Sequence, residues 1–192
     1  MNNARVVSVN RSLALPRLIN GESVLTGIGK QPVDGPVEVS AMGLDGDEQA
    51  DLSVHGGLAK AVYAYPHAHY AFWQTVRAQA GVAAADAPMS PGLLGENLTI
   101  AGVSEEQLWI GDHLLLPGCV LAVSQPRYPC FKFNAAMGFN QASKLMAQSG
   151  YCGVYLAVVE PGTVSAGDEV RVQPGPREVG VRDLFWAKMR RR

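Results

Sequence analysis

The strongest constraint on the fold is the way short apolar segments alternate with glycine and proline along the chain. The 192 residues include 21 glycines and 12 prolines. Both residue types favour turns, because glycine adopts positive φ angles and proline restricts φ. The apolar runs between these turns have the length of strands rather than of long helices. The pattern therefore predicts a mainly β chain with a few helices, arranged as a partly open β-barrel.

Individual elements follow from the same pattern. We expect strands at 6–9, 37–40, 61–65, 98–102, 108–111, 113–117, 119–125, 152–160 and 168–173. One helix is expected from Pro66, at the first-turn position that proline tolerates, to about Ala80. Two more are expected over 134–148 and 181–190. Residues 82–95 are expected to form a long irregular loop, and loops of this length inside a compact domain often carry function.

The charge and hydropathy of the chain exclude several classes of protein. Lys and Arg number 16 and Asp and Glu number 17, so the net charge of −1 does not indicate a nucleic-acid or membrane-surface protein. The longest apolar stretches are far too short to span a bilayer, and the first residues lack the pattern of a signal peptide. We therefore expect a cytoplasmic protein.

The three cysteines, Cys119, Cys130 and Cys152, are odd in number and widely spaced. This spacing excludes a full disulfide framework, a CxxC redox pair and a four-cysteine zinc or iron–sulfur site within one chain. Any electrons used in redox chemistry must therefore come from a partner. Cys119 and Cys152 lie in apolar segments and are expected to pack in the core.

The segment 123–133, with the sequence VSQPRYPCFKF, is the most informative stretch for chemistry. Its two prolines remove backbone donors and favour extended geometry, so the chain should leave a strand here as a stiff, non-helical segment. In extended geometry Cys130 and Lys132 point to the same side, and Arg127 is near enough to reach the same space. Two nearby cations are expected to lower the pKa of the Cys130 thiol, and the thiolate binds metals or attacks electrophiles. A small buried hydrophobe is the alternative interpretation of Cys130, and the segment alone leaves both open.

Two further segments place polar groups next to glycines. Gly56 and Gly57 allow backbone N–H groups to approach an anion, beside His55 and Lys60, although a glycine pair is most often only a turn. Asn97 stands at the start of an expected strand, and its amide can both donate and accept hydrogen bonds. A turn residue that satisfies its own loop is the equal alternative for Asn97.

Other polar clusters are given structural interpretations. Asp45, Asp47 and Asp51 lack the distal glutamate of a calcium-binding loop and are interpreted as turn-capping residues. The sequence GIGK at 27–30 lacks the remainder of a dinucleotide or P-loop fingerprint. Neither cluster is therefore predicted to form a site.

Four ordered segments of the sequence resemble the MOSC family, named after the C-terminal domain of molybdenum cofactor sulfurase. They are GLDGDEQAD…HGG…KAVYAYP, PGLLGENLT, IGD…PG…VSQPRYPCFK and GYCGVY…GTVSAGD. The branch that the chain resembles is the bacterial YiiM-type branch, linked to resistance against 6-N-hydroxylaminopurine. The resemblance covers about residues 5–175. It implies a MOSC β-barrel domain over 1–175, followed by a short C-terminal helical tail over 176–192.

The resemblance also implies a cofactor and its binding residues. The cofactor is the molybdenum cofactor, molybdopterin, and Cys130 would be the catalytic residue that supplies a thiolate ligand to molybdenum. Because the cofactor is anionic, its pocket needs cations. The matching motifs offer His55, Lys60, Arg127 and Lys132. Polar or backbone contacts are assigned to Gly56, Gly57, Asn97, Ser124 and Gln125.

The activity that the resemblance implies is the reduction of N-hydroxylated compounds, such as hydroxylamines and N-hydroxylated bases. The chain would then be a molybdenum-dependent oxidoreductase that acts on a small substrate and receives electrons from a flavoprotein. A homodimer is left open, and no nucleic-acid or membrane partner is expected. Two alternatives remain: a sulfur carrier with a persulfide on Cys130, and a non-catalytic cofactor-binding protein. The loop at 82–95 favours a site that faces a substrate.

The chain departs from the family pattern at two places. Ala59 stands where relatives of this branch commonly carry an acidic residue. Many relatives also continue into a three-helix C-terminal domain, whereas this sequence ends at Arg192 with one expected short helix.

Overall fold

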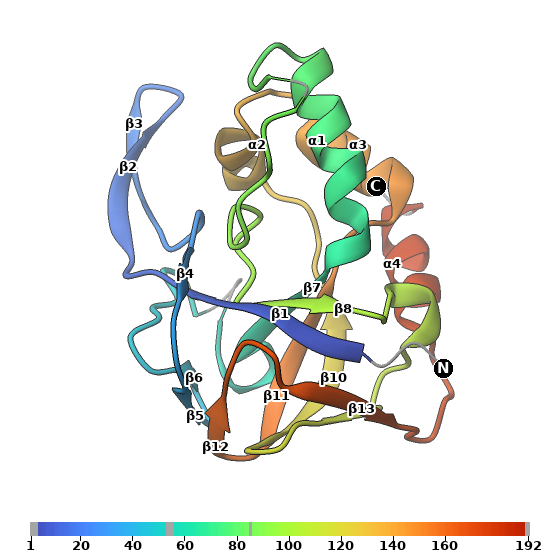
Figure 1. The fold of residues 1–192 in the computed structure, drawn as a ribbon. Coiled ribbons are helices and arrows are strands. Elements are labelled where there is room, and N and C mark those ends of the chain that lie inside the picture. Colours follow the sequence, from blue (N-terminus) through green and yellow to red (C-terminus); the bar gives the residue numbers. More distant parts are fainter. Residues whose placement is uncertain (1–3, 53–55, 85, 191–192) are drawn as a thin grey trace.

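The computed structural model describes residues 4–52, 56–84 and 86–190. Its main feature is a barrel of seven strands in which the last strand pairs back with the first (Figure 1). Around the barrel these are β13 (Glu169–Gln173), β9 (His113–Leu115), β10 (Val120–Pro126), β11 (Val154–Glu160), β7 (Val62–Pro66), β8 (Leu98–Ala101) and β1 (Ala4–Arg11). The expectation of a mainly β chain is confirmed. The barrel is closed rather than partly open, because β1 pairs with β13 through Ala4 and Val170.

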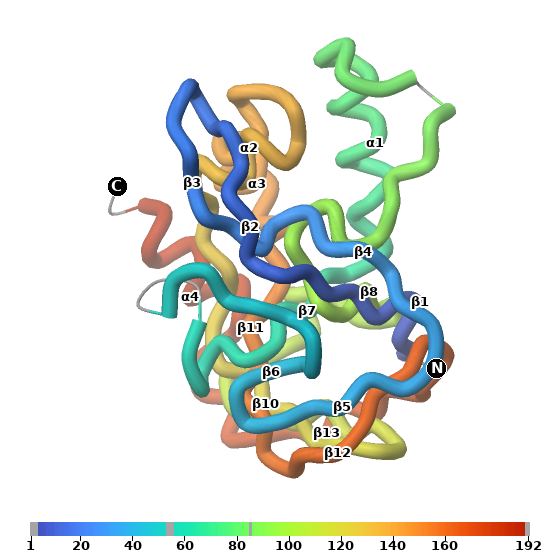
Figure 2. Tube along the Cα trace, turned by 90° about the vertical axis from the view of Figure 1, so that its left-hand side faces the viewer, coloured from blue at the N-terminus to red at the C-terminus, as the bar shows by residue number. Residues whose placement is uncertain are grey.

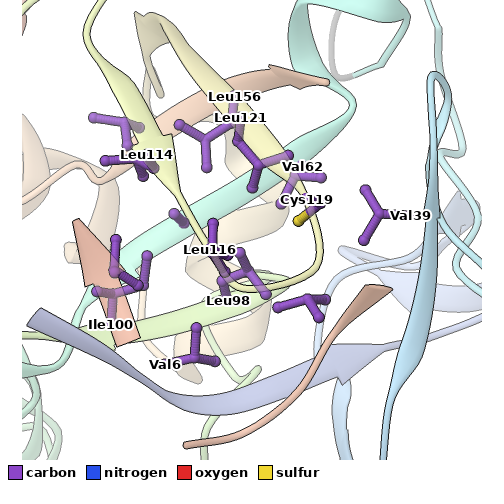
Figure 3. Close-up of a cluster of buried hydrophobic side chains, with 14 of the residues drawn as sticks. Val6, Val39, Val62, Leu98, Ile100, Leu114, Leu116, Cys119, Leu121 and Leu156 are labelled. Atoms are coloured by element: carbon purple, nitrogen blue, oxygen red, sulfur yellow. The ribbon is translucent and has the colours of Figure 1, made fainter. Parts of the chain in front are cut away.

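The interior of the barrel is an apolar core contributed by alternate residues of the strands. Val6, Leu98, Leu114, Leu121 and Leu156 are buried there (Figure 3). This alternation is typical of strands with one face on the core. The alternation is seen in β10 and β13, whereas all five residues of β7 are buried, so the sequence placed the strands by their short apolar runs as well as by alternation.

The two cysteines expected to pack in the core do so. Cys119 belongs to the barrel core, and burial, together with the nearby carboxylate of Asp168, raises the pKa of its thiol to about 11. Cys152 is fully buried in a second apolar cluster, and burial raises the pKa of its thiol well above the ordinary value. Both thiols are therefore protonated and inert at neutral pH.

A layer of helices covers one end of the barrel (Figure 1). The helices are α1 (Tyr70–Gln79), α2 (Phe131–Met137), α3 (Ala142–Ser149) and α4 (Val181–Met189). Trp73, Phe133 and Phe185 are completely buried in the cluster that joins this layer to the barrel. None of the described helices is long and apolar enough to cross a membrane.

One strand pair sets the path of the chain between barrel and helices. β7 and β8 run parallel, whereas the other neighbouring pairs of the barrel are antiparallel. A parallel pair needs a long crossover connection. The crossover contains a 3₁₀ turn, η2 (His67–His69), then α1 and the expected irregular loop, whose residues 82–84 and 86–95 have no helix or strand. The end of this loop returns to the barrel beside β7.

Apart from shifts of a few residues at strand ends, three expected elements differ from the structure. Pro66 is the last residue of β7 rather than the start of a helix, and α1 begins at Tyr70. The helix expected over 134–148 is two helices, because Gly138 adopts a left-handed conformation and ends α2.

The strand expected at 108–111 is instead a turn that follows η3 (Glu105–Gln107). Asp112 accepts the N–H of Trp109 and bends the chain there, and Trp109 forms only an isolated bridge with Gly180. Side-chain hydrogen bonds of this kind compete with strand pairing.

Several strands outside the barrel had no counterpart in the sequence-based expectations. β2 (Leu15–Ile19) and β3 (Glu22–Thr26) form a hairpin that stands away from the barrel (Figures 1 and 2). β4 (Gln31–Val33) extends the sheet beyond β1. The expected strand at 37–40 is β5 (Val37–Ser40), which pairs with β6 (Gly43–Leu44) and β12 (Gly162–Val164) in a small second sheet.

Gly153 occupies a tight position where β11 begins below the helical layer. Its φ angle is +65°, and a Cβ atom there would lie 2.6 Å from the carbonyl oxygen of Ala64 and 2.8 Å from the rings of Tyr63 and Tyr65. Its N–H donates to Oε1 of Glu105 at 2.6 Å. Both the backbone conformation and the space therefore require glycine here.

We expect Gly153→Ala to lower the free energy of unfolding much more than Gly35→Ala. Gly35 has a similar φ of +75° but open space around its Cα, so both variants incur about 1 kcal/mol for the left-handed backbone. The overlap with Ala64 and the two rings should add about 2 kcal/mol or more for Gly153→Ala alone. Urea denaturation of the two variants measures the difference, and equal losses would contradict the packing described.

Glu96 is a carboxyl group buried between the barrel and α1. Its Oε1 accepts hydrogen bonds from the Tyr70 hydroxyl, the Gly92 N–H at 2.8 Å and the Thr99 hydroxyl at 3.2 Å. Its Oε2 has no hydrogen-bond partner within the described ranges. Burial raises the pKa of this carboxyl above its ordinary value in spite of these bonds. The native state therefore holds the proton more tightly than the unfolded chain, so stability falls as the pH rises through the native pKa.

We expect Glu96→Gln to remove this loss of stability at higher pH. Glutamine retains the accepting oxygen and replaces the ionisable one, so the free energy of unfolding of the variant relative to the parent should increase from pH 4.5 to pH 8. Urea denaturation at these two values measures the change. A difference between variant and parent that does not vary with pH would show that Glu96 does not titrate abnormally.

Candidate functional site

A cavity open to solvent lies where the barrel meets the helical layer and the base of the β2–β3 hairpin, and its empty space amounts to about 620 Å³ when the open solvent at its mouth is included. Residues from six separate stretches of the chain line it. They are Thr26, Gly27, Ile28, Lys30, Asp47, Glu48, Gln49, Ala50, Asp51, Lys60, Tyr63, Leu94, Gly95, Asn97, Arg127, Cys130, Lys132 and Tyr155. The cavity therefore collects Cys130 and three of the four predicted cations, Lys60, Arg127 and Lys132.

Cys130 enters the cavity from the segment between β10 and α2. Its backbone is extended, with φ −138° and ψ 165°, as the two prolines predict, and α2 begins at the next residue. Its carbonyl accepts a hydrogen bond of 2.8 Å from the Ser143 hydroxyl, and its Sγ lies 4.0 Å from Nη2 of Arg127. The thiol is thus half-buried and faces a cation.

The expected extended geometry does not continue to Lys132. Lys132 lies in the first turn of α2, so it does not share a strand face with Cys130. Both residues still line the cavity, because the helix turns the lysine toward the hairpin, where its Nζ donates to the carbonyl of Leu25 at 3.0 Å.

Arg127 carries a buried positive charge in the cavity wall. Its residue is 4% exposed, and its guanidinium lies 5.4 Å from the ring centroid of Tyr63 and 5.0 Å from that of Phe133. Its Nη1 donates to the thioether of Met146 at 3.3 Å. Within the described ranges no carboxylate forms an ion pair with it.

The phenols next to Arg127 do not balance its charge. Burial raises the pKa of Tyr63 well above its ordinary value and raises that of Tyr155 as well, although Arg127 opposes both shifts. Both phenols are therefore neutral at physiological pH. An arginine stays charged under all these conditions, so the cavity wall retains a cation with no anionic partner in the part of the chain that the structure describes.

Lys30 and Asp47 form a buried ion pair at the same cavity, which the sequence reasoning missed. Their side chains are only 7% and 4% exposed. Oδ1 of Asp47 accepts the ammonium of Lys30 and the N–H of Ser12, and Oδ2 accepts the amide of Asn97 at 2.9 Å. The signal for this pair was in the GIGK segment, which was assigned no site because it lacks a nucleotide-binding fingerprint, and in Asp47, which was interpreted as a turn-capping residue.

Asn97 connects this ion pair to the barrel. Its Oδ1 accepts the N–H of Tyr63 at 3.0 Å, and its Nδ2 donates to Asp47 and to the carbonyl of Asn10. The amide lines the cavity with its hydrogen bonds already made. We therefore describe Asn97 as a residue that positions Asp47 and β7.

Of the other described residues that were expected to contact the cofactor, one lines the cavity and four do not. Lys60 lines it, with its Nζ 5.9 Å from the ring centroid of Tyr155. Gly57 donates its N–H to Oε1 of Gln49 at 2.8 Å. Gly57 does not line the cavity, and neither do Gly56, Ser124 and Gln125.

Ser124 and the glycines have structural contacts instead. The Ser124 hydroxyl faces the carbonyls of Ala59 and Tyr155. Gly56 packs so closely against Gln49 that a Cβ would lie 2.3 Å from its Oε1. His55, the fourth predicted cation, lies outside the described residues.

Comparison with known proteins gives a family and several relatives. The MOSC domain model matches residues 51–171. The YflK protein of Bacillus subtilis is 38% identical over 87% of this chain and 73% of its own length. Protein YiiM of Escherichia coli is 37% identical over 73% of this chain and 61% of its own length. A protein of Gibberella moniliformis called a reductase is 36% identical over 81% of this chain, which spans only 27% of that relative.

The fold has a counterpart among solved structures. The crystal structure of YiiM from Geobacillus stearothermophilus superposes with a TM-score of 0.76 at 27% identity, covering 98% of this chain and 85% of that one. The matching family model covers the Cys130 segment and most of the cavity wall. Sequence, fold and relatives agree that this chain belongs to the MOSC family.

Proposed function

We propose that this protein is a molybdenum-cofactor-dependent reductase of N-hydroxylated compounds, with Cys130 as the protein ligand of the metal. The observation that carries the proposal is a half-buried thiol 4.0 Å from a buried guanidinium that has no carboxylate partner among the described residues, both in the wall of one cavity. Membership of the MOSC family supports a function related to the molybdenum cofactor.

The donor set of the cavity fits this cofactor. A thiolate is a soft ligand that suits a metal already held by sulfur. The cofactor is anionic, and Arg127, Lys30, Lys60 and Lys132 all line the same cavity. Among the described residues Arg127 has no carboxylate to supply the counter-charge that a buried cation requires, and an anionic ligand would supply it.

Each side chain has a distinct role in this proposal. Cys130 would hold the metal. Arg127 would bind an anionic group of the cofactor and favour the thiolate form of Cys130 through its charge. Lys30 uses one of its three N–H donors for Asp47, and its others would bind oxygen atoms of the ligand. The tyrosines Tyr63 and Tyr155 would limit the access of water to the buried side of the cavity.

The chemistry requires electrons and protons from outside the chain. Bound in this cavity, the cofactor would supply the two-electron chemistry that cleaves an N–O bond. The balanced reaction is R–NHOH + 2 e⁻ + 2 H⁺ → R–NH₂ + H₂O. We propose that a separate flavoprotein delivers the electrons. One relative of this chain is called a reductase, and most of its length lies outside the region matched here.

We expect Cys130→Ser to abolish reduction of hydroxylamine and to lower the bound molybdenum, while the fold is retained. The substitution nearly keeps the size of the side chain, and the contact of the Cys130 sulfur with Arg127 is a long one of 4.0 Å. Molybdenum by elemental analysis and pterin fluorescence after oxidation, on protein from a host that makes the cofactor, measure the binding. Turnover is measured with a flavoprotein donor, and Cys119→Ala serves as a control at a buried cysteine outside the cavity.

Two results would count against this assignment. Full activity and metal content in Cys130→Ser would remove Cys130 from the site. Parent protein that lacks metal and pterin but carries a persulfide on Cys130 by mass spectrometry would favour the sulfur-carrier alternative.

We expect Arg127→Met to weaken cofactor binding by about tenfold or more without lowering the stability of the cofactor-free protein. The loss follows from removing a charge-assisted contact to an anion. Stability should be unchanged or higher, because a buried charge without a partner is replaced by an apolar side chain of similar length. Cofactor content and urea denaturation of the cofactor-free protein test this, with Lys132→Met as the half-exposed comparison. A variant that retains the cofactor but unfolds more easily would make Arg127 a structural residue only.

A further inference from the structure

The helix α4, which comes after the barrel in the sequence, is firmly attached to the rest of the protein. At its start, the N–H of Val181 donates to the carbonyl of Leu108 at 3.0 Å. In its middle, Phe185 is completely buried. α4 follows β13, the last strand of the barrel, and lies outside residues 51–171, which the family model matches. Its contacts with the site therefore come in addition to the matched domain.

The short segment 127–130 carries both the guanidinium and the thiol of the site. These four described residues lie in neither a helix nor a strand. Arg127 and Cys130 line the cavity, whereas Tyr128 is not among the residues that line it. The position of the segment therefore depends on side-chain contacts, and Tyr128 is the residue that makes them outside the cavity.

Tyr128 packs on α4 through two side chains of that helix. Its ring is stacked on the ring of Phe185, with 5.9 Å between the centroids and 6° between the planes. Nζ of Lys188 lies 4.0 Å from the centroid of the Tyr128 ring. Residues three apart are neighbours on a helix surface, so Phe185 and Lys188 contact the same ring. Aromatic stacking and cation–π contacts both favour a defined arrangement of the groups involved.

α4 also reaches the site indirectly, through α3 (Figure 1). Trp186 lies against Gly150, which ends α3, and a Cβ on that glycine would lie 3.1 Å from the indole ring. Further back in α3, the hydroxyl of Ser143 donates to the carbonyl of Cys130 at 2.8 Å. The thioether of Met146 accepts a hydrogen bond of 3.3 Å from the buried guanidinium. A shift of α4 would therefore disturb contacts of both reactive groups.

We propose that α4 is a positioning element of the site, which keeps the Cys130 thiol beside the Arg127 guanidinium through Tyr128 and α3. The inference rests on the proposed function, because it concerns the proposed metal ligand. Phe185 and Lys188 are positioning residues: neither lines the cavity, and both act through Tyr128. Groups held in place by packed neighbours are already arranged for their ligand.

Two thiol reagents of opposite charge measure whether the guanidinium stays beside the thiol. Methanethiosulfonates convert a thiolate into a mixed disulfide and release methanesulfinate; the sulfonatoethyl reagent is an anion and the trimethylammonioethyl reagent is a cation. The fraction of thiolate cancels in the ratio of the two rate constants, anion over cation. In the cofactor-free parent we expect this ratio at Cys130 to be about tenfold higher than for free cysteine. Arg127→Met should remove the increase, and an unchanged ratio would overturn the proposal.

Phe185→Leu removes the stacked ring without changing any charge. We expect it to lower the ratio at Cys130 by about threefold or more, because Tyr128 loses its support. The matched control is Phe72→Leu, which belongs to the same apolar cluster but packs with other rings. The control should keep the ratio of the parent. Equal ratios in Phe185→Leu and Phe72→Leu would overturn the proposal.

The two buried cysteines show whether each variant is folded. Cys119 and Cys152 are 4% and 0% exposed, so they should stay unlabelled in every folded variant. Mass spectrometry of peptides locates the label. A ratio that falls in Phe185→Leu only together with labelling of Cys119 and Cys152 would make α4 a stabilising helix and overturn its positioning role.

Variants of the exposed Lys188 avoid any disturbance of the core. Lys188→Met should lower the ratio by about twofold more than Arg190→Met, which removes the same charge from an exposed residue directly after the helix. Lys188→Arg should restore the ratio of the parent, because arginine also makes cation–π contacts. Equal effects of Lys188→Met and Arg190→Met would show that only the general charge of the surface matters, which would remove Lys188 from the proposal.

The measurements on cofactor-free protein separate this inference from the proposed function. If both are correct, Phe185→Leu should also lower the molybdenum and pterin bound by protein from a host that makes the cofactor, and Phe72→Leu should not. If the ratio falls as expected but the parent binds no molybdenum or pterin, the positioning role stands and the reductase function fails. If the ratio and the cofactor content of Phe185→Leu both equal those of the parent, the positioning role fails and the reductase function stands.

Discussion

The site depends on a positive charge that the fold buries without balancing. Moving an ionised group out of water is costly unless a partner compensates it. At Arg127 the compensation within the described residues comes from the faces of Tyr63 and Phe133, from the phenol of Tyr155 and from two sulfur atoms, and no carboxylate forms an ion pair with it. The charge is kept at the wall of a cavity open to solvent, so an anion that enters there gains a cation that is already desolvated and fixed in place.

The surrounding strands and helices hold the Arg127 guanidinium and the Cys130 thiol next to each other. β10 ends at Pro126, and the N–H of Arg127 donates to the carbonyl of Gly153 at 3.4 Å, so the segment leaves the barrel against β11. Phe133 anchors α2 in the apolar cluster below the helices. Cys130 lies between these two attachments. Its position is therefore determined by strands and helices rather than by a free loop.

The sequence indicated the barrel and the Cys130 segment because both depend on local patterns. Alternating apolar residues predict strands, and prolines at 126 and 129 predict an extended segment whatever surrounds them. Cys130, Arg127 and Lys132 from this segment, together with Lys60 and Asn97 from the segments that carry the family resemblance, line one cavity. The ends of helices were harder to predict from the sequence, because the break between α2 and α3 depends on the left-handed conformation of one residue, Gly138.

The Lys30–Asp47 pair shows why the remainder could not be predicted. Each residue stands in a glycine-rich segment that has the local pattern of a turn. Their meeting depends on the path of the chain through β4, β5 and β6, and Asp47 then reaches Asn97, 50 residues further on. The hairpin of β2 and β3 is another example, because its exposed leucines give no alternating pattern and its place is fixed through Lys132, 107 residues away from Leu25. No local signal encodes contacts over such distances.

These long separations have a consequence for the order in which the molecule is made. Contacts between distant residues form late in folding, because the entropy of closing long loops must first be overcome. The cavity unites residues from Thr26 to Tyr155, and the barrel beneath it closes only when β13 joins β1. A growing chain therefore has no binding site until nearly all of it has left the ribosome. A ligand of this cavity binds only the finished fold and stabilises the native state as a whole.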